Sequence, residues 1–314
     1  MPNTIKANQW LSRLLLEVTS NSRRVFANGR QQVEITVIVE PRDDDELDEY
    51  ALDSIDLALI DPDGNPQSLG AGLLVQNERD PRFEYHAAGG GSASPLMKVA
   101  PNTVRRSFYV SSTLPGGTLT TVYASIRKDA DNHFITNTGS FQSSVVIESI
   151  TPLRHPEAAF KLDMQERVSF RTATGKLRDA ETNSDVGYFG FRDPNNSIVE
   201  SIPHAVPSGE PFYTRNNWDH VIFSFELIND YSQICQVTTY AEGAPMDLDY
   251  NGRRFTPRAG NMAVSVYHQR FYDVWSNSIN EDKSLWTVVD RHGNEQDIEF
   301  FTENSGRIIK FRAN

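Results

Sequence analysis

The 314-residue chain contains a single cysteine, Cys235. One cysteine excludes an internal disulfide and any zinc site built from several cysteines. Cys235 stands in an apolar, strand-like context, so we expect a buried small hydrophobic residue rather than a reactive thiol. The chain also lacks an apolar run of about 18 residues, the length that a membrane-spanning helix requires. No stable membrane insertion is therefore predicted.

Positive charge is scarce relative to negative charge. The chain has 30 Lys and Arg against 42 Asp and Glu, a formal net charge of -12. Phosphate backbones and anionic membrane surfaces would be repelled by this balance, so no nucleic-acid partner is predicted. Near the N-terminus, Arg13 interrupts the apolar stretch Trp10–Leu16 and no small-residue cleavage site follows. We expect a soluble protein, either cytoplasmic or exported without a conventional signal peptide.

Recognisable catalytic motifs are also missing. None of the seven histidines forms a pair at zinc-ligand spacing, and no Gly-x-Ser-x-Gly turn is present. Asp219 and His220 are adjacent, which on a strand would point them to opposite faces. No catalytic residue, metal ligand or cofactor is predicted, and the chain is expected not to be an enzyme. A catalytic triad assembled from distant residues is the alternative.

Two acidic stretches resemble cation sites. Asp43–Glu49 could converge on Ca²⁺, but a run of like charges is more often a solvated loop. Asp247–Gly252 matches the opening of an EF-hand loop, yet the twelfth position, which should be glutamate, is Arg258. Both stretches are interpreted as turns or loops. Ala87–Ser94 lacks the Gly-Lys-Ser/Thr ending of a phosphate loop and is interpreted as a flexible loop.

The patterns that are present indicate β-structure. In residues 31–39 the apolar side chains of Val33, Ile35, Val37 and Val39 alternate with polar ones, which predicts a strand with one apolar face. Asn28 and Gly29 precede it and suit a turn with a left-handed backbone. A further strand is predicted for residues 13–19, whereas residues 4–12 could form a short helix.

Turn signals recur along the whole chain without a long helical pattern, as in a sandwich or barrel. Pro152 and Pro156 follow directly after a strand-like stretch. Because proline removes a backbone donor and restricts the preceding residue, this segment is the predicted domain boundary. The domains would be residues 1–150 and 151–314.

The strand of residues 13–19, the Ala27-Asn28-Gly29 turn and the alternating strand after it resemble a bacterial immunoglobulin-like domain of the invasin and intimin type. The segment Leu57–Pro66, which contains Asp-Pro-Asp-Gly-Asn-Pro, resembles a hairpin of that family. In the family these pieces are usually close together, whereas here the acidic run and a strand-like stretch separate them. The resemblance covers about residues 13–75. It implies a β-sandwich used as a spacer or binding module, and it implies no catalytic residues.

A similar string occurs three times in the chain. Residues 57–65, 188–196 and 286–294 each consist of an apolar strand followed by Asp-x-x-Gly/Asn-Asn. The copies indicate either a duplicated sandwich or one hairpin solution reached independently.

Large aromatic residues concentrate in the second half. On alternating strands they are expected to be core residues, namely Trp218, Tyr267, Phe271, Tyr272, Trp275 and Trp286. If Trp218 or Trp275 is exposed, it becomes an anchor for a protein or glycan partner. The predicted binding residues are Trp218, Tyr267, Tyr272 and Trp275.

Together these patterns predict an all-β protein of two immunoglobulin-like sandwiches in tandem, the first with an acidic insertion and the second aromatic-rich. Its expected role is non-catalytic binding or structure in a bacterial or phage-like surface, tail or toxin assembly, for example as an adhesin. The expected partner is a protein or a glycan, and an oligomer is compatible with the pattern. The alternatives are a β-rich toxin acting on host membranes through residues 85–95 or an amphipathic hairpin, and a hydrolase with a dispersed site.

Overall fold

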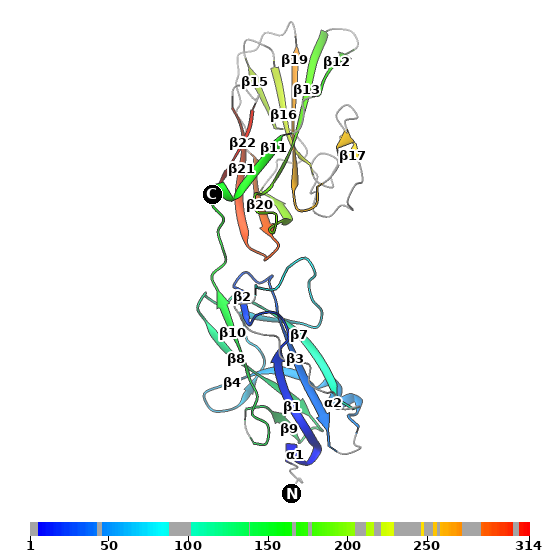
Figure 1. The fold of residues 1–314 in the computed structure, drawn as a ribbon, viewed down its shortest axis with the longest axis vertical. Coiled ribbons are helices and arrows are strands. Elements are labelled where there is room, and N and C mark those ends of the chain that lie inside the picture. The colour runs from blue at the N-terminus through cyan, green and yellow to red at the C-terminus, as the bar shows by residue number, and fades with distance from the viewer. Residues whose placement is uncertain are drawn as a thin grey trace. The chain divides into compact units, whose positions relative to one another are not determined.

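The chain divides into two compact units, Met1–Leu153 and Arg154–Asn314, called here the first and the second unit. The computed structural model describes the backbone of residues 6–42, 46–87, 102–137, 139–164, 168–174, 178–204, 212–216, 221–228, 246–247, 254–255, 258–271, 284–303 and 308–314. Side chains are described for residues 6–42, 46–87, 102–137, 139–164, 187–202, 204, 258–262, 285–301 and 310–314. The described part of both units is built mainly of strands, so the protein is all-β (Figure 1).

Two short helices accompany the strands of the first unit. The helices are α1 (Ala7–Trp10) and α2 (Glu49–Asp53). The strands are β1 (Leu11–Val18), β2 (Arg24–Phe26), β3 (Val33–Pro41), β4 (Asp56–Ile60), β5 (Pro66–Gln67), β6 (Leu73–Gln76), β7 (Val104–Ser112), β8 (Leu119–Arg127), β9 (His133–Ile135) and β10 (Val145–Ile150).

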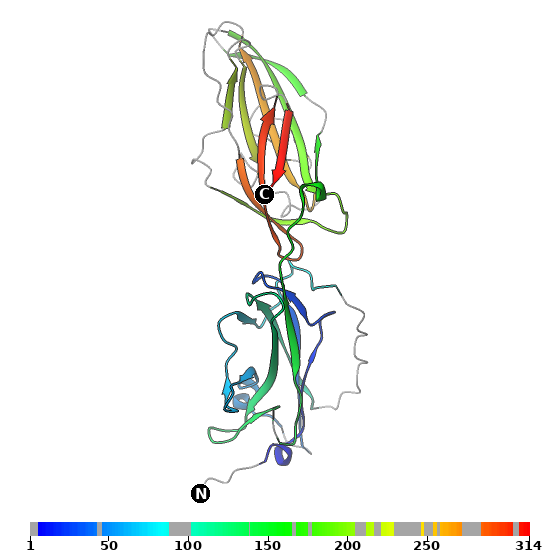
Figure 2. The ribbon, with the colours of Figure 1, turned by 90° about the vertical axis from the view of Figure 1, so that its left-hand side faces the viewer.

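The strands of the first unit form two sheets. One sheet has the order β1-β3-β7-β6 and is antiparallel throughout. The other has the order β2-β10-β8-β4-β5, with β9 beside β8, and its β2 and β10 run parallel. Figure 2 shows the two sheets as separate layers. One apolar cluster contains residues from both sheets, including Val37 and Phe108 from the first and Val122 and Ile147 from the second. The two sheets are therefore packed face to face as a sandwich.

The alternating pattern of residues 33–39 has the predicted consequence. Val33, Ile35, Val37 and Val39 lie on β3 with no exposed surface, and all four belong to the core of the first unit. The turn before β3 also agrees with the prediction, because Gly29 has a φ of +71°. Asn28 Oδ1 accepts hydrogen bonds from the backbone N–H groups of residues 30 and 31, at 3.0 Å each. The asparagine side chain thus supplies a hydrogen-bond acceptor for two backbone N–H groups of the turn.

One expectation for the first unit was wrong. The segment after the acidic run was interpreted as strand-like, but Glu49–Asp53 is the helix α2. Asp48 belongs to the acidic run and accepts a hydrogen bond from Ala51 N at 2.8 Å. A carboxylate that caps the first turn of a helix satisfies an N–H that lacks a helical partner. An acidic residue of the predicted loop, Asp48, therefore caps the helix α2.

The second unit contains the single-turn 3-10 helix η1 (Glu157–Ala159) and the remaining strands. These strands are β11 (Phe160–Met164), β12 (Val168–Thr174), β13 (Arg178–Phe191), β14 (Ile198–Pro203), β15 (Phe212–Asn216), β16 (Val221–Ile228), β17 (Met246–Asp247), β18 (Arg254–Phe255), β19 (Met262–Phe271), β20 (Ser284–Asp290), β21 (Glu295–Glu303) and β22 (Ile308–Ala313).

The second unit is also a sandwich of two sheets, and β17 and β18 form a separate two-stranded sheet. The first sheet has the order β11-β13-β19-β16-β15, and β11 and β12 pair with successive parts of the long strand β13. The second sheet has the order β14-β20-β21-β22. Phe160 and Phe189 from the first sheet pack in one cluster with Trp286 and Phe300 from the second. Trp286 is 1% exposed, which confirms its predicted place in the core.

Two of the three similar strings form the same turn. Asp61 N and Asp290 N donate to the carbonyls of Asn65 and Asn294, at 3.0 and 2.9 Å. Each aspartate Oδ1 accepts from the N–H of the same asparagine, at 2.7 and 2.9 Å. The glycine of each turn has a positive φ, +87° at Gly64 and +80° at residue 293.

The three strings occupy different connections. Residues 61–65 join β4 to β5 within one sheet, residues 290–294 join β20 to β21, and residues 193–196 lie between β13 and β14, which belong to opposite sheets. Corresponding positions would be expected if the strings had been inherited by duplication. The recurrence is therefore a local turn solution and says nothing about duplication of the units.

Candidate binding surface

The residues predicted as binding anchors cannot be assigned a site. Trp218, Tyr272 and Trp275 lie outside the described residues. Tyr267 lies on β19, where its backbone is between Ser184 of β13 and Ser224 of β16, but its side chain lies outside the described part. A role for these residues stays a prediction.

A different cluster of functional side chains occurs on the first unit, at the outer face of the sheet β1-β3-β7-β6. Glu34 alternates with the core residues of β3 and so points away from the core. Its carboxylate accepts hydrogen bonds from Ser107 Oγ on β7 at 3.1 Å and from Tyr85 OH at 2.9 Å. Thr36 Oγ1 is 3.1 Å from Ser107 Oγ and 2.9 Å from Thr19 Oγ1. A chain of hydroxyl groups thus connects β3, β7 and Thr19, the residue after β1, beside one carboxylate.

Tyr85 reaches Glu34 from the connection between β6 and β7. The described part of this connection, residues 77–87, is held to the sheet by two glutamines that directly precede β3. Gln32 Oε1 accepts from Asp80 N at 2.9 Å, and Gln31 Nε2 donates to Glu84 O at 3.0 Å. Both glutamines are buried, at 5% and 0% exposure. Buried amides that satisfy backbone groups hold a segment in one place, because leaving those groups unpaired would cost free energy.

Arg79 adds a cation to the same cluster. Its guanidinium carbon lies 4.4 Å from the centroid of the Tyr85 ring, within the range of a cation–π interaction. Its NH2 group donates to Phe83 O at 3.3 Å, and Phe83 is buried at 3% exposure. The arginine itself is exposed. The cluster therefore presents a positive group whose position is set by a buried aromatic residue.

The two tyrosines of the cluster keep their protons at neutral pH. Burial, then the hydrogen bond to Glu34 and its charge, raises the pKa of Tyr85 well above the ordinary value of 10.0. Burial and the charge of Glu34 also raise the pKa of Tyr109 on β7, and the positive charge of Arg79 opposes this rise. Neutral phenols donate hydrogen bonds and present an apolar ring. We call Glu34, Arg79, Tyr85 and Tyr109, together with the nearby Leu74, the tyrosine cluster.

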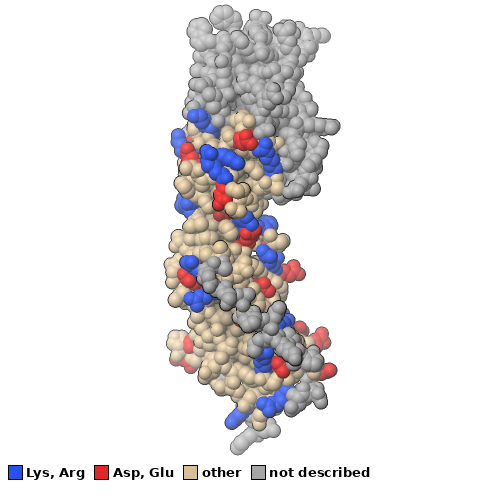
Figure 3. Space-filling view, viewed as in Figure 1, with Lys and Arg blue, Asp and Glu red and all other residues tan. Residues whose placement is uncertain are grey.

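Leu74 completes the cluster on the edge strand β6. It pairs with Ser111 of β7, two residues after Tyr109, and its side chain is 53% exposed. Tyrosine and arginine are enriched at the energetic centres of protein interfaces, where they combine apolar contact with hydrogen bonding. The chemistry of this surface suits recognition. The charged side chains on the face drawn in Figure 3 are interspersed in sign, so a field of one sign does not dominate that face.

A second polar cluster lies on the second unit, on the outer face of β20 and β21. Thr287 Oγ1 donates to Asp297 Oδ1 at 2.6 Å and is in hydrogen-bond contact with His204 Nε2. Because the single hydroxyl proton goes to Asp297, the contact with His204 requires the histidine to donate. A nucleophilic threonine would need the histidine as acceptor. The direction of these hydrogen bonds is therefore the reverse of the one that a catalytic triad requires.

One residue of the suspected EF-hand motif has another partner. Asp247 is paired with Arg254 in the backbone register of β17 and β18, and Arg258 pairs with Asp163. The Arg258 guanidinium also lies 4.0 Å from the centroid of the Tyr188 ring. The position that an EF-hand reserves for glutamate is therefore engaged elsewhere. Among the described residues, no three His, Cys, Asp or Glu side chains are gathered as a metal site would need. The described helices include none that is long and apolar enough to cross a membrane.

Comparison with known proteins gives little more. No family model matches the chain, and no curated protein matches it in sequence. Among solved structures, the chain is similar to the collagen binding domain of the Erysipelothrix rhusiopathiae surface protein RspB. The alignment covers 96% of this chain and 92% of that one, at 8% sequence identity and a TM-score of 0.22. A score of this size does not establish a shared fold.

Proposed function

We propose that the protein is a non-catalytic binding protein made of two immunoglobulin-like sandwiches in tandem. The order of the strands carries the proposal. An immunoglobulin domain places its strands A, B, E and D in one sheet and C, F and G in the other. In the first unit, β1-β3-β7-β6 would be A-B-E-D and β4-β8-β10 would be C-F-G. The strand β2 beside β10 and the strand β5 beside β4 extend this arrangement at the two edges.

The second unit supports the same assignment with different additions. Its sheet β11-β13-β19-β16 follows the A-B-E-D order, and β14-β20-β21 follows the C-F-G order. The strand β15 extends the first of these sheets, and β22 extends the second. Two units with the same order of strands along the chain are what a tandem of one domain type predicts. The resemblance to the invasin and intimin type over residues 13–75 is the ground for placing the protein in a bacterial or phage-like surface, tail or toxin assembly.

Recognition in this proposal takes place at the tyrosine cluster of the first unit, and the partner is a protein. Arg79 and Tyr109 supply two of the three residue types that are enriched at interface centres, and Leu74 supplies exposed apolar area. Residues 77–87, which carry Arg79, are held by Gln31 and Gln32, so less entropy is lost when they bind a partner. A glycan is the alternative partner, since tyrosine rings also stack on sugars.

The test is a screen of the whole chain against protein and glycan arrays, repeated with variants of the cluster. We expect Arg79→Ala and Tyr109→Ala each to weaken the interaction about tenfold or more, equivalent to about 1.4 kcal/mol. Tyr123→Ala is the matched control, because Tyr123 is a half-buried tyrosine on β8 of the opposite sheet. It should bind as the unchanged protein does.

Three outcomes would contradict the proposal. Binding that survives both cluster substitutions but is lost in Trp218→Ala or Trp275→Ala would move the recognition site to the second unit. Hydrolysis of a substrate by the purified chain would contradict the non-catalytic assignment, and leakage of liposomes would favour the membrane-active toxin.

A further inference from the structure

The edge strand β6 of the first unit exposes two adjacent apolar side chains. Leu74 is 53% exposed and Val75 is 37% exposed. Among the large hydrophobic residues that the described part of the chain exposes, these two alone are neighbours in sequence. Consecutive residues of a strand point to opposite faces of its sheet. Both faces of the sheet therefore have exposed apolar surface at this edge.

Val75 occupies a position on the inner face of the sheet. It pairs with Val110 of β7, which belongs to the core and has no exposed surface. Leu73, two residues before it, is also buried in the core. Val75 stays exposed because β7 is the one strand that pairs with β6 among the described residues. A further strand beside β6 would cover Val75 and extend the inner layer of the sandwich.

The backbone of β6 directs hydrogen-bonding groups to the same edge. Thr113 N donates to Gly72 O at 2.8 Å, and these two residues continue the register of β6 and β7. In an antiparallel pair, residues that bond to the partner strand alternate with residues whose N–H and C=O point away from it. Residues 74 and 76 therefore bond to β7, whereas the N–H and C=O of Val75 point to the edge. Leu73 N already donates to Gly70 O at 3.2 Å, so Val75 is the residue of β6 that offers both groups.

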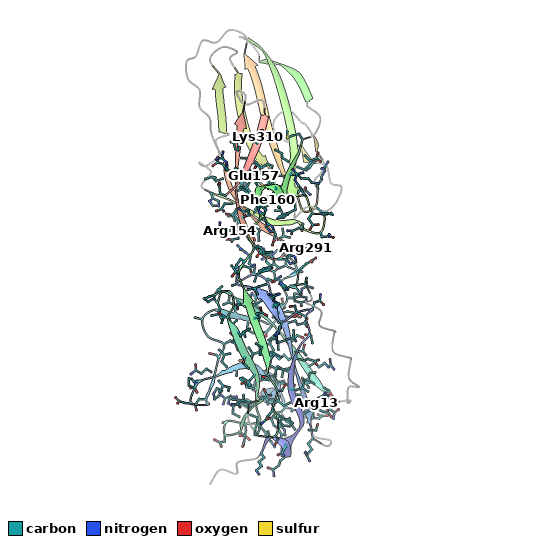
Figure 4. All side chains as sticks on the ribbon, turned by 60° about the vertical axis from the view of Figure 1, so that its left-hand side comes forward. Arg13, Arg154, Glu157, Phe160, Arg291 and Lys310 are labelled. Carbon is teal, nitrogen blue, oxygen red and sulfur yellow. The ribbon has the colours of Figure 1, made fainter. Side chains whose placement is uncertain are left out.

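The sequence of β6 lacks the features that usually prevent another strand from adding to an edge, which are charged side chains and proline. It reads Leu-Leu-Val-Gln. The strand at the other end of the same sheet, β1, contains Glu17 and also Arg13, which is labelled in Figure 4. The strands at the two ends of the opposite sheet contain Arg24 in β2 and Pro66 in β5. Of these four strands, β6 is the one without such protection.

A positive charge lies just beyond the end of β6. Arg79 is exposed, and its guanidinium is placed over the ring of Tyr85. Its neighbour Asp80 pairs with Arg82 at 2.7 Å, and the described residues include no carboxylate that forms an ion pair with Arg79. The carboxylate of Glu34 accepts from two hydroxyl groups instead. An exposed guanidinium in this position is complementary to a carboxylate of a partner.

We propose that the partner of the tyrosine cluster is an extended segment of another protein, which adds to β6 as a further antiparallel strand. This inference rests on the proposed function, in which the cluster recognises a protein. The backbone of the segment bonds to the N–H and C=O of Val75, and an apolar side chain of the segment covers Val75. A carboxylate near the N-terminal end of the segment pairs with Arg79, because an antiparallel segment starts beside the end of β6. Backbone hydrogen bonds supply affinity in this mode, and the side chains supply specificity.

The probe is a phage-displayed library of random linear peptides of about 12 residues, longer than an ordinary strand, selected against the whole chain. We expect the enriched peptides to have alternating apolar residues and an aspartate or glutamate toward the N-terminal end. An enriched peptide is then made in two N-methylated forms, one modified at its odd residues and the other at its even residues. The form whose methyl groups face β6 should bind at least about tenfold more weakly than the other. Equal effects of the two modifications would overturn the proposal, since backbone bonds along one edge of the peptide would then not carry the interaction.

Val75→Pro tests the same hydrogen bonds from the side of the chain. It removes an N–H that faces the edge and none that bonds to β7, and proline is tolerated at such positions of an edge strand. The first unit should keep its melting transition, and the peptides should bind at least about tenfold more weakly. Ser68→Pro is the matched control, because Ser68 is an exposed residue directly after β5 at the edge of the opposite sheet. It should bind the peptides as the unchanged chain does.

The outcomes distinguish this proposal from the proposed function. A partner from the array screen that is lost in Arg79→Ala and Tyr109→Ala but binds Val75→Pro normally would overturn strand addition and leave the proposed function standing. A partner that binds all three variants normally would overturn both. Peptides that bind folded Val75→Pro as they bind the unchanged chain, or a library that yields no peptide, would overturn strand addition. Dimers of the chain in sedimentation experiments that are absent in Val75→Pro would overturn the choice of partner, since a second copy would then occupy the edge.

Discussion

Glu34 is the point at which the tyrosine cluster can be perturbed with the clearest expected effect. Glu34→Ala removes the acceptor of two hydrogen bonds, from Ser107 Oγ at 3.1 Å and from Tyr85 OH at 2.9 Å. A hydrogen bond to a charged group contributes about 1.5–3 kcal/mol when it is buried. Glu34 is half-buried, so water replaces part of each bond, and we expect a combined loss of about 1–2 kcal/mol.

The assay is calorimetric unfolding of the whole chain. For a unit of this size, a loss of 1 kcal/mol lowers the melting temperature by about 2–4 °C, so the transition of the first unit should move down by about 2–8 °C. Glu148→Ala is the control, because the Arg24–Glu148 pair is 3.4 Å long with side chains 43% and 27% exposed. Such a surface pair contributes at most about 1 kcal/mol. Glu34→Ala and Tyr85→Phe should combine to less than the sum of their separate effects, since they share one hydrogen bond.

Two results would refute this reasoning. A shift of less than about 1 °C for Glu34→Ala would mean that the two hydrogen bonds are replaced by water without cost. Full additivity of the two substitutions would mean that the hydrogen bond between the two side chains does not contribute to stability.

Three further predictions concern pH and packing. The raised pKa of Tyr85 gives stability that is present below the ordinary tyrosine pKa of 10.0 and is lost as pH rises toward the folded-state pKa. The stability of Tyr85→Phe should therefore fall less steeply with alkaline pH than that of the unchanged chain. The lowered pKa of Asp290 gives stability that is present above the ordinary value of 3.8 and is lost as pH falls through the folded-state pKa, and Asp290→Asn should remove that acid-dependent part in titrated melting experiments. Phe300→Ala removes a ring with no exposed surface and should cost about 3–5 kcal/mol in chemical denaturation, and a cost under about 1 kcal/mol would contradict the packing described.

The fold was predictable where local pattern decides it. The alternation of residues 33–39 specifies one buried face, and β3 forms with that face in the core. The Asp-x-x-Gly-Asn string specifies a turn because aspartate bonds the backbone and glycine adopts a positive φ. The helix α2 was missed because its capping residue, Asp48, belongs to an acidic run that has the composition of a loop. Local composition does not distinguish a solvated acidic loop from a carboxylate at a helix start.

The tyrosine cluster was not predictable from local pattern. Tyr85 and Glu34 are 51 positions apart and meet where buried glutamines hold residues 80 and 84 against the sheet. Strand periodicity places Glu34 and Tyr109 on outward positions, but it does not say that their strands are neighbours. The sequence signal that could have found the cluster is the pair of adjacent glutamines before β3, since two amides at the start of an apolar strand need partners when buried. Attention to Trp218 and Trp275 instead followed residue type alone.

The most direct test of recognition at the first unit is a hydrogen-exchange footprint of the whole chain with a partner found by the array screen. The account predicts slower exchange at residues 74–85 and 107–111, with Arg79→Ala weakening the footprint in proportion to affinity. Residues 121–125 of the opposite sheet should be unchanged. Protection confined to the second unit, with residues 74–85 exchanging as they do without partner, would contradict the account.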